Sequence, residues 1–295
     1  MTNAPVIPAT PADALEKPEK RKPMGIFFWM CAGWLTLTAI IALVVQWLPI
    51  QNPNFQDYAW FNSGPSHAHW LGTDELGRDL LSRIVWGSRV SLEISLGAMA
   101  IGFLVGGSLG MLAAYRRGRA DLILTSVMST GLAFPAIVAV IAVLSFWTPS
   151  SPYKITVVVG ATSIPLVYRV IQASALSIGS REFVVAAKVQ GASDRRIVFR
   201  EILPNVAPTG LSFLLFGIAT TVTLEGVLAF LGLSVQSPTS SWGTLINEGA
   251  QQVLNYGSNW SLTLFPALEL CLFILSLNFV GDRLRSYFDV TEVKL

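Results

Sequence analysis

The chain has 295 residues, of which 52% are hydrophobic and 13% are charged, whereas soluble domains carry about 25% charged residues. Its 20 Lys and Arg against 18 Asp and Glu leave a formal net charge of +2, which is too small to attract nucleic acid over a distance. The composition also excludes intrinsic disorder, which requires low hydrophobicity and high net charge, and a coiled coil, which requires heptads rich in Glu and Lys.

Six apolar runs are long enough to cross a bilayer, whose hydrocarbon core of about 30 Å requires roughly 20 consecutive apolar residues in a helix. Buried helices of a soluble protein are shorter and keep a polar stripe, which these runs lack. The pattern therefore predicts an all-α membrane protein with six transmembrane helices. The predicted spans cover residues 25–48, 90–115, 122–147, 155–175, 211–233 and 262–280.

The first run, at residues 25–48, is predicted to remain in place as a membrane anchor. It exceeds the length of the apolar core of a secretory signal, and the sequence PIQNPNFQ after it offers no small-residue cleavage site. Cys31 and Cys271 both lie in apolar runs, where cysteines usually act as small hydrophobic side chains. Redox chemistry is therefore not expected.

Basic residues accumulate on one side of the predicted membrane. Sixteen of the 20 fall in the N-terminal tail, the loop after the second span, residues 169–200 and the C-terminal tail. Because Lys and Arg collect in cytoplasmic loops, this bias places these segments in the cytoplasm, and the even number of spans agrees. We therefore expect a cytoplasmic N-terminal tail at 1–24, an extracytoplasmic segment at 49–88 and a cytoplasmic tail at 282–295.

The extracytoplasmic segment 49–88 contains HWLGTDELGRDLLSRIVWGS, in which apolar residues recur at helical spacing beside polar ones. This pattern predicts an amphipathic helix on the outer surface of the membrane, with Thr73 as its N-cap. The same segment holds His67 and His69, and two histidines alone in an outer loop are more often solvated than bound to a metal. The predicted apolar stripe is Leu76, Leu80, Leu81, Ile84 and Val85, and the polar side is Arg78, Asp79, Ser82 and Arg83.

Between the fourth and fifth spans, the sequence REFVVAAKVQGASDRRIVFREILPNVAPT predicts a helix-turn-helix outside the bilayer. The first helix covers 182–190, Gly191 ends it, and the second covers 193–201 and stops before Pro204. The paired alanines are too small to anchor this segment in lipid, but they allow another protein surface to approach closely. From the residues alone, a cytoplasmic partner and a merely solvated loop both remain open.

Segment 181–204 resembles the cytoplasmic EAA signature of bacterial ABC importer permeases, in which an acidic-Ala-Ala triplet precedes a glycine and then Ile-Leu-Pro. Val185 departs from the usual Glu of the triplet, and Glu182 supplies a carboxylate nearby. The resemblance implies that this segment is the coupling helix that sits in a groove of an ATPase. The residues expected to form the coupling surface are Glu182, Ala186, Ala187, Gly191, Ala192, Ser193, Asp194, Leu203 and Pro204.

The motifs LGTDELGRDLLSRIVWGSRVSL and FLGL with SWGTLINEG narrow the resemblance to the C-type subunit of dipeptide and oligopeptide permeases, with nickel permeases as close relatives. The final apolar run is similar to the last helix of the same family, with Asn278, Gly281 and Asp282 in their expected places. The likeness covers residues 25–290 and implies a type I importer fold with its permease core at 89–281.

The resemblance implies a permease subunit of an ATP-driven importer of di- or oligopeptides in the bacterial inner membrane. Its expected partners are a second homologous permease, two ATPase subunits, an extracytoplasmic substrate-binding protein and the lipid bilayer, and nucleic acid is not among them. No GxxxxGK[ST] phosphate loop occurs in the sequence, so ATP and Mg²⁺ are expected on the partner ATPases alone. The chain itself is expected to bind no cofactor or metal and to be no enzyme.

Two carboxylates inside predicted spans are candidate substrate residues, because a charge in the membrane is costly unless it is paired or faces water. At about 1.5 Å per residue, Glu225 and Glu269 both lie roughly 10–12 Å from the outer ends of their helices, so one cavity could hold both. Glu269 contacts either a cationic substrate group or a hydrogen-bond partner between helices. Gly102, Gly106 and Gly110 recur every four residues, which favours close helix packing over a substrate role.

Two alternative functions remain open. A nickel or other small-solute importer of the same type would share these motifs. A secondary transporter would also have six helices and intramembrane carboxylates, but it would work without an ATPase.

Overall fold

The computed structural model describes residues 24–147, 149–257 and 259–292, with side chains described up to residue 288. Within these residues the chain is helical and contains no β-strand, which confirms the all-α prediction. Five helical segments are long and apolar enough to cross a membrane, and a bent pair of shorter helices, α4 (Gly118–Ala133) and α5 (Ala136–Phe146), makes a sixth if it counts as one span. The five continuous segments are Ile26–Trp47, Leu80–Arg116, Pro152–Gly179, Asp194–Phe230 and Ser261–Phe288.

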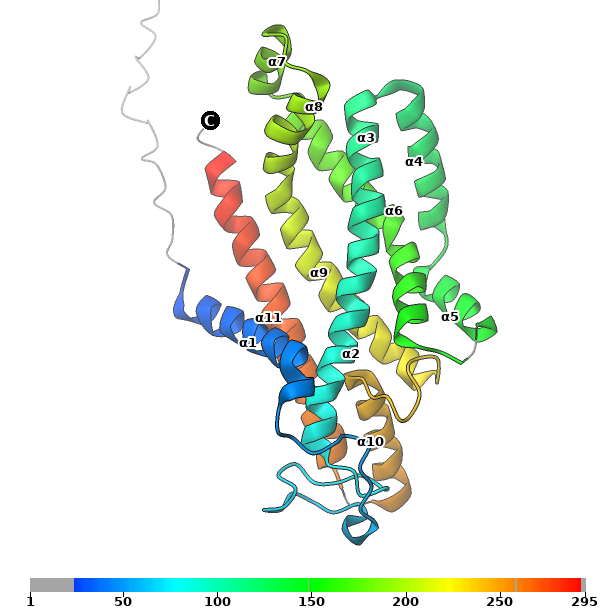
Figure 1. Cartoon of the computed structure of the whole chain (residues 1–295). Coiled ribbons are helices and arrows are strands. Elements are labelled where there is room, and N and C mark those ends of the chain that lie inside the picture. Colours follow the sequence, from blue (N-terminus) through cyan, green and yellow to red (C-terminus); the bar gives the residue numbers. More distant parts are fainter. Residues whose placement is uncertain (1–23, 148, 258, 293–295) are drawn as a thin grey trace, which may run out of the picture.

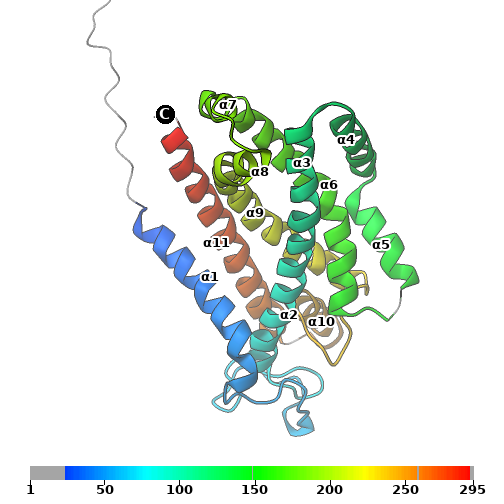
Figure 2. The same ribbon diagram turned by 45° about the horizontal axis from the view of Figure 1, so that its top comes forward.

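The long helices form a bundle whose two ends carry different short elements (Figure 1). α7 (Glu182–Val189) and α8 (Asp194–Arg196) project at one end, called here the elbow end. α10 (Trp242–Tyr256) lies at the opposite end, called the α10 end, together with the chain that precedes α2 (Figures 1 and 2). α1 (Ile26–Val44) packs along α11 (Ser261–Glu292) on one side of the bundle.

The longest span combines α2 (Leu80–Ile101), the π-helix η3 (Gly102–Gly107) and α3 (Ser108–Arg116) into 37 residues of continuous helix. The predicted amphipathic surface helix, separate from a span starting at residue 90, is therefore wrong. Asp79, rather than Thr73, is the N-cap, and its side chain accepts a hydrogen bond from the backbone N–H of Ser82 at 2.8 Å. The polar residues before and within the first turns face other protein groups instead of water.

Three glycines allow this long helix to lie close to α6 (Pro152–Gly179). Ideal β-carbons at Gly106 and Gly110 would meet backbone atoms of α6, and one at Gly102 would meet the side chain of Ser163. Any larger residue at these positions would push the two helices apart. The structure thus places the predicted glycine ladder in a helix–helix contact.

The third predicted span, residues 122–147, is broken into α4 (Gly118–Ala133) and α5 (Ala136–Phe146), which bend by 77°. Pro135 lies at the break, and because proline has no backbone N–H it cannot continue the helical ladder. None of the residues of α4 is buried. The apolar surface of α4 is therefore left uncovered by the described part of the chain.

The second helix of the predicted helix-turn-helix, at 193–201, does not stop before Pro204, so that predicted boundary is also wrong. α8 continues through the π-helix η4 (Ile197–Ile202) into α9 (Leu203–Phe230), and the whole segment forms one span. Pro204 stands in the first turn of α9, directly after η4. In membrane helices a proline is tolerated where a local π turn adjusts the backbone hydrogen bonds around it, so the helix runs on.

Trp242, the first residue of α10, fixes that helix to the bundle. Its side chain is fully buried. Its backbone N–H donates to Ser91 Oγ at 3.1 Å, and its indole Nε1 donates to the carbonyl oxygen of Ile84 at 3.2 Å. The indole ring also meets Phe273 of α11 edge-on, with 5.2 Å between ring centroids. α10 is therefore packed against both α2 and α11.

Candidate functional site

The elbow, defined as residues 181–196, is a helix, a tight turn and the start of the next helix. The turn is closed by two backbone hydrogen bonds, from Gly191 to the Lys188 carbonyl at 3.0 Å and from Ala192 to the Ala187 carbonyl at 3.1 Å. Gly191 has a φ of +79°, in the left-handed region that a residue with a β-carbon adopts at a cost. The predicted helix stop at Gly191 is thus present for this conformational reason.

Two buried side chains hold the elbow against the bundle. Val184 on the inner face of α7 is fully buried, and Ile197 at the start of η4 is 1% exposed. Both belong to the main hydrophobic core, together with Ile178 at the end of α6 and Val206 in α9. The elbow is therefore a packed continuation of two membrane-spanning helices, so a force on it passes directly into α6 and α9.

The opposite face of α7 carries an exposed stripe of Glu182, Val185, Ala186 and Val189. These positions are spaced i, i+3, i+4 and i+7, so they lie on one side of the helix. Val185 is 50% exposed and Val189 is 82% exposed. Sequence reasoning missed Val189 as a surface contact residue, although its spacing of four from Val185 was a usable signal.

A three-residue contact, called here the Tyr115 clip, ties the elbow to the end of α3. Tyr115 Oη donates a hydrogen bond to Asp194 Oδ1 at 2.6 Å. The ammonium of Lys188 lies 5.5 Å from the centre of the Tyr115 ring, within the range of a cation–π contact. Asp194 was a predicted coupling residue, whereas Tyr115 was not predicted because it lies 79 residues away in the chain.

The predicted coupling residues do not all lie on one surface. Leu203 and Pro204 instead line an apolar groove of about 900 Å³ beside α3 and α9, together with Phe103 and Phe288. Ala187 and Ala192 are half-buried in the elbow turn. The exposed members within the elbow are Glu182, Ala186, Gly191, Ser193 and Asp194.

Glu225 and Glu269 occupy different surroundings, so the expectation of one shared cavity is not met. Glu225 is 1% exposed and accepts hydrogen bonds from the Ser234 hydroxyl and, at 2.6 Å, from Ser241 Oγ. Because Ser241 is the N-cap of α10, the carboxyl group lies at the positive end of that helix. Glu225 therefore connects α9 to α10.

Glu269 is half-buried in a separate small groove of about 250 Å³ between α1, α2 and α11, lined also by Trp34 and Thr38. The two carboxyl groups diverge because α9 packs against α10 at Glu225, whereas α11 turns Glu269 toward α1. A sequence gives the depth of a residue in its helix, but it does not give the direction in which the side chain points.

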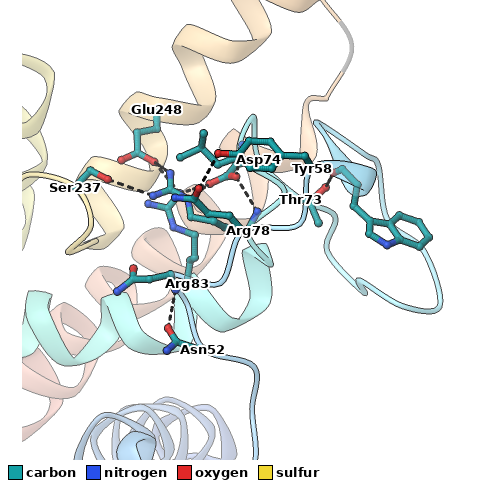
Figure 3. A network of polar contacts seen from close by, with 12 residues as sticks. Asn52, Tyr58, Thr73, Asp74, Arg78, Arg83, Ser237 and Glu248 are labelled. Atoms are coloured by element: carbon teal, nitrogen blue, oxygen red, sulfur yellow. Dashed lines mark hydrogen bonds and ion pairs between the residues drawn. The ribbon is translucent and has the colours of Figure 1, made fainter.

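A buried charged network occupies the α10 end (Figure 3). Asp74 Oδ2 accepts from Arg78 Nε at 2.6 Å and from Arg83 Nη1 at 2.7 Å. Arg83 Nη1 also lies 2.8 Å from Glu248 Oε2 on α10, and Arg78 Nη1 donates to Ser237 Oγ at 3.2 Å. The network joins the chain before α2 to α10. The acidic and basic residues close together in DELGRDLLSR were the sequence signal that could have indicated this network.

His69 belongs to the same end and is 6% exposed rather than solvated. Its Nδ1 lies 2.9 Å from Asp79 Oδ1, so the imidazole helps to hold the N-cap of α2. Among the described residues, no group of three or more His, Cys, Asp or Glu is placed to hold a metal ion.

The family model that matches this chain is described as "Binding-protein-dependent transport system inner membrane component", and it matches residues 106–290. A relative from Pectobacterium atrosepticum, named glutathione transport system permease protein GsiD, is 36% identical over 88% of this chain and 86% of its own length. The dipeptide transport system permease protein DppC of Alkalihalophilus pseudofirmus is 33% identical over 77% of this chain and 73% of its own length.

A solved structure is also similar in fold. The chain superposes on a chain of the MetNI methionine ABC transporter, in an inward-facing conformation, with a TM-score of 0.57. The match covers 70% of this chain and 96% of that chain, at 20% sequence identity. At 20% sequence identity, this similarity shows a shared arrangement of helices.

Proposed function

This chain belongs to the family of binding-protein-dependent transport system inner membrane components, and from that premise we propose that it is a permease subunit of an ATP-driven importer of short peptides. Relatives named for glutathione and dipeptide transport are more than 30% identical to it over most of its length. Both of those names refer to short peptides. The type I importer fold agrees with the likeness to the MetNI chain.

The exposed stripe on α7 is the single observation that carries this proposal. Val185 and Val189 present apolar surface to the outside of the bundle, while Val184 on the other face is fully buried. An exposed apolar stripe on a firmly packed helix is suited to a partner's groove. A separate ATPase subunit fits this role, since the chain has no phosphate loop of its own.

The proposed assembly contains this chain, a second homologous permease, two ATPases at the elbow end and a substrate-binding protein at the α10 end. Basic residues concentrate at the elbow, including Arg181, Lys188 and Arg195, which supports a cytoplasmic elbow and cytoplasmic termini in a bacterial inner membrane. ATP and Mg²⁺ would bind to the ATPases. Closure of the ATPases would move the elbow, and α6 and α9 would transmit this movement to open the other end.

The proposed function can be tested by introducing a negative charge into the exposed stripe of α7. We expect Val189→Asp to reduce peptide uptake and ATPase activity in the reconstituted transporter by at least about tenfold, because an unpaired carboxylate would be buried against the partner at a cost of several kcal/mol. The amount of chain in the membrane should not change. Val189→Ala is the matched control, because it changes the same 82% exposed position without adding a charge.

Normal uptake by the Val189→Asp variant would contradict the proposal. Solute movement by the isolated chain without any ATPase would instead support the competing class of secondary transporters.

A further inference from the structure

A polar cavity at the α10 end, called here the α2 pocket, lies apart from both Glu225 and Glu269. It has a volume of about 550 Å³ and is enclosed by α2, the segment 45–54 and the loop 238–240. Its size falls within the range of roughly 300–1,000 Å³ that is common for small-molecule sites. The α2 pocket is therefore large enough for a short peptide.

Two opposite charges line the α2 pocket. Arg89 and Glu93 lie one turn apart on the same face of α2 and both contribute to the pocket wall. They form no ion pair with each other among the described residues. Arg89 Nη1 donates to Gln46 Oε1 at 3.2 Å, and Glu93 is exposed with no hydrogen-bond partner within the described chain. The pocket thus presents one positive and one negative group to a ligand.

The remaining wall supplies groups that suit a peptide unit. Asn52 and Gln46 contribute side-chain amides, and Thr239 contributes a hydroxyl. Trp86 and Pro238 add apolar surface that a peptide side chain could contact. Amide and hydroxyl groups can both donate and accept hydrogen bonds, as a peptide bond requires. The rest of the pocket wall therefore offers both hydrogen-bonding groups and apolar surface beside the two charged residues.

We propose that the α2 pocket binds a zwitterionic short peptide, whose carboxylate pairs with Arg89 and whose ammonium pairs with Glu93. This inference rests on the proposed function and names the part of the chain that would first meet the peptide. Arg is suited to the carboxylate because its planar guanidinium can donate two parallel hydrogen bonds. Because Arg89 and Glu93 lie one helical turn apart, the ligand must carry a negative and a positive group a short distance from each other.

The depth of the pocket agrees with an entrance site. Glu93 lies about 35 Å along the helix from Arg116 at the elbow end, taking about 1.5 Å per residue. This distance slightly exceeds the hydrocarbon thickness of about 30 Å, so the pair lies near the outer boundary of the membrane. A peptide released at the α10 end would reach this pair before it entered the apolar part of the bundle.

The test measures ligand protection of a cysteine in the pocket. The complete transporter is reconstituted into vesicles with Thr239→Cys in a background in which Cys31 and Cys271 are replaced by alanine. An uncharged methanethiosulfonate reagent, whose local concentration does not depend on surface charge, is added from the α10 side. Its reaction rate is compared with and without alanyl-alanine, N-acetyl-alanyl-alanine or alanyl-alanine amide. We expect the free dipeptide alone to slow the reaction, by at least about threefold.

Charge removal and a matched control complete this design. Glu93→Gln and Arg89→Gln should each abolish protection by alanyl-alanine, because each removes the partner of one ligand charge. Glu75→Gln should retain it, since Glu75 is exposed at the same end and does not line the pocket. Equal protection by all three compounds, or by none, would overturn the inference. So would a faster reaction without peptide when phosphatidylethanolamine is replaced by phosphatidylglycerol, because a lipid headgroup would then be the occupant.

Uptake of alanyl-alanine by vesicles containing the unsubstituted chain distinguishes failure of the proposed function from failure of the proposed peptide site. Absence of ATP-dependent uptake of any peptide would reject the proposed function. Uptake without selective protection of the introduced cysteine would reject the peptide site alone.

Discussion

Arg83 lies at the α10 end, and its side chain is buried, with 1% of its surface exposed. It pairs with Asp74 and Glu248, and Arg78 would be the one cationic partner left to both carboxylates among the described residues if Arg83 were removed. Asp74 would keep the backbone hydrogen bonds that its Oδ1 accepts from Leu76 and Arg78. Breaking one partner of a buried pair typically costs about 3–5 kcal/mol, because a buried charge is left uncompensated. Glu248 is 29% exposed, so water would compensate part of that cost.

We therefore expect Arg83→Ala to lower the melting temperature of the purified protein by roughly 5–10 °C. Tryptophan fluorescence during heating would measure this change. Arg119→Ala is the control, because Arg119 is exposed beyond the end of α3, and it should leave the melting temperature unaltered. An unchanged melting temperature for Arg83→Ala would mean that the charged network does not stabilise the α10 end.

Tyr115 is predicted to be a positioning residue for transport. Tyr115→Phe removes the hydrogen bond to Asp194 but keeps the ring beneath Lys188. A hydrogen bond to a charged group contributes about 1.5–3 kcal/mol, so the elbow should be less firmly held. We expect a several-fold lower ratio of peptide molecules moved to ATP hydrolysed, with ATP hydrolysis itself largely kept.

A double-mutant cycle checks this prediction. Asp194→Ala should have a similar effect, and the double variant should be no worse than either single one, because both remove the same contact. Tyr153→Phe on the exposed surface of α6 is the matched control. Independent, additive effects of the two single changes would show that Tyr115 and Asp194 act separately.

The glycine ladder that the sequence predicted lies in the contact between the α2–α3 helix and α6. At Gly106 a β-carbon would collide with the backbone of α6, whereas at Gly33 in α1 it would meet nothing within 4 Å. Gly106→Ala should therefore lower the melting temperature, even though alanine favours a helix by about 1 kcal/mol over glycine. Gly33→Ala should leave it unchanged or raise it slightly. Equal behaviour of the two variants would show that α2–α3 and α6 tolerate separation.

α6 and α9 give the molecule its mechanical continuity. α6 ends at Gly179, three residues before α7 begins, and α9 continues the helix that starts at Asp194 on the other side of the elbow. The elbow is thus attached to two long helices rather than to flexible loops. A displacement of α7 would tilt both helices together, which is the requirement for coupling the two ends of the bundle.

At the scale of the whole molecule, α7 and α10 lie at opposite ends of the bundle (Figure 2). A membrane across the bundle would separate them, so we expect cysteines introduced by Val189→Cys and Leu254→Cys to react with a membrane-impermeant maleimide from opposite sides. Right-side-out vesicles should label the second, and inside-out vesicles should label the first, in a background without Cys31 and Cys271. Labelling of both from one side would contradict the proposed orientation.

Part of the candidate site follows from local sequence. The helix at 182–189 and its stop at Gly191 are set by backbone preferences of a few adjacent residues, so the elbow was predicted close to its observed bounds. Other parts depend on distant segments. The partner of Asp194 comes from α3, and one of the two partners of Arg83, Glu248, comes from α10, 165 residues further along the chain. A pattern of polar residues cannot distinguish a solvated face from one that is paired in this way.

The amino-acid sequence alone determined that this is a helical membrane protein and roughly where its spans lie, because the free energy of placing a side chain in lipid is a property of that residue and its near neighbours. Tertiary structure alone decided that α2 begins among buried charges, that the third span bends, and that Glu225 and Glu269 lie apart. These outcomes depend on which helix packs against which, and therefore on contacts between residues far apart in the chain.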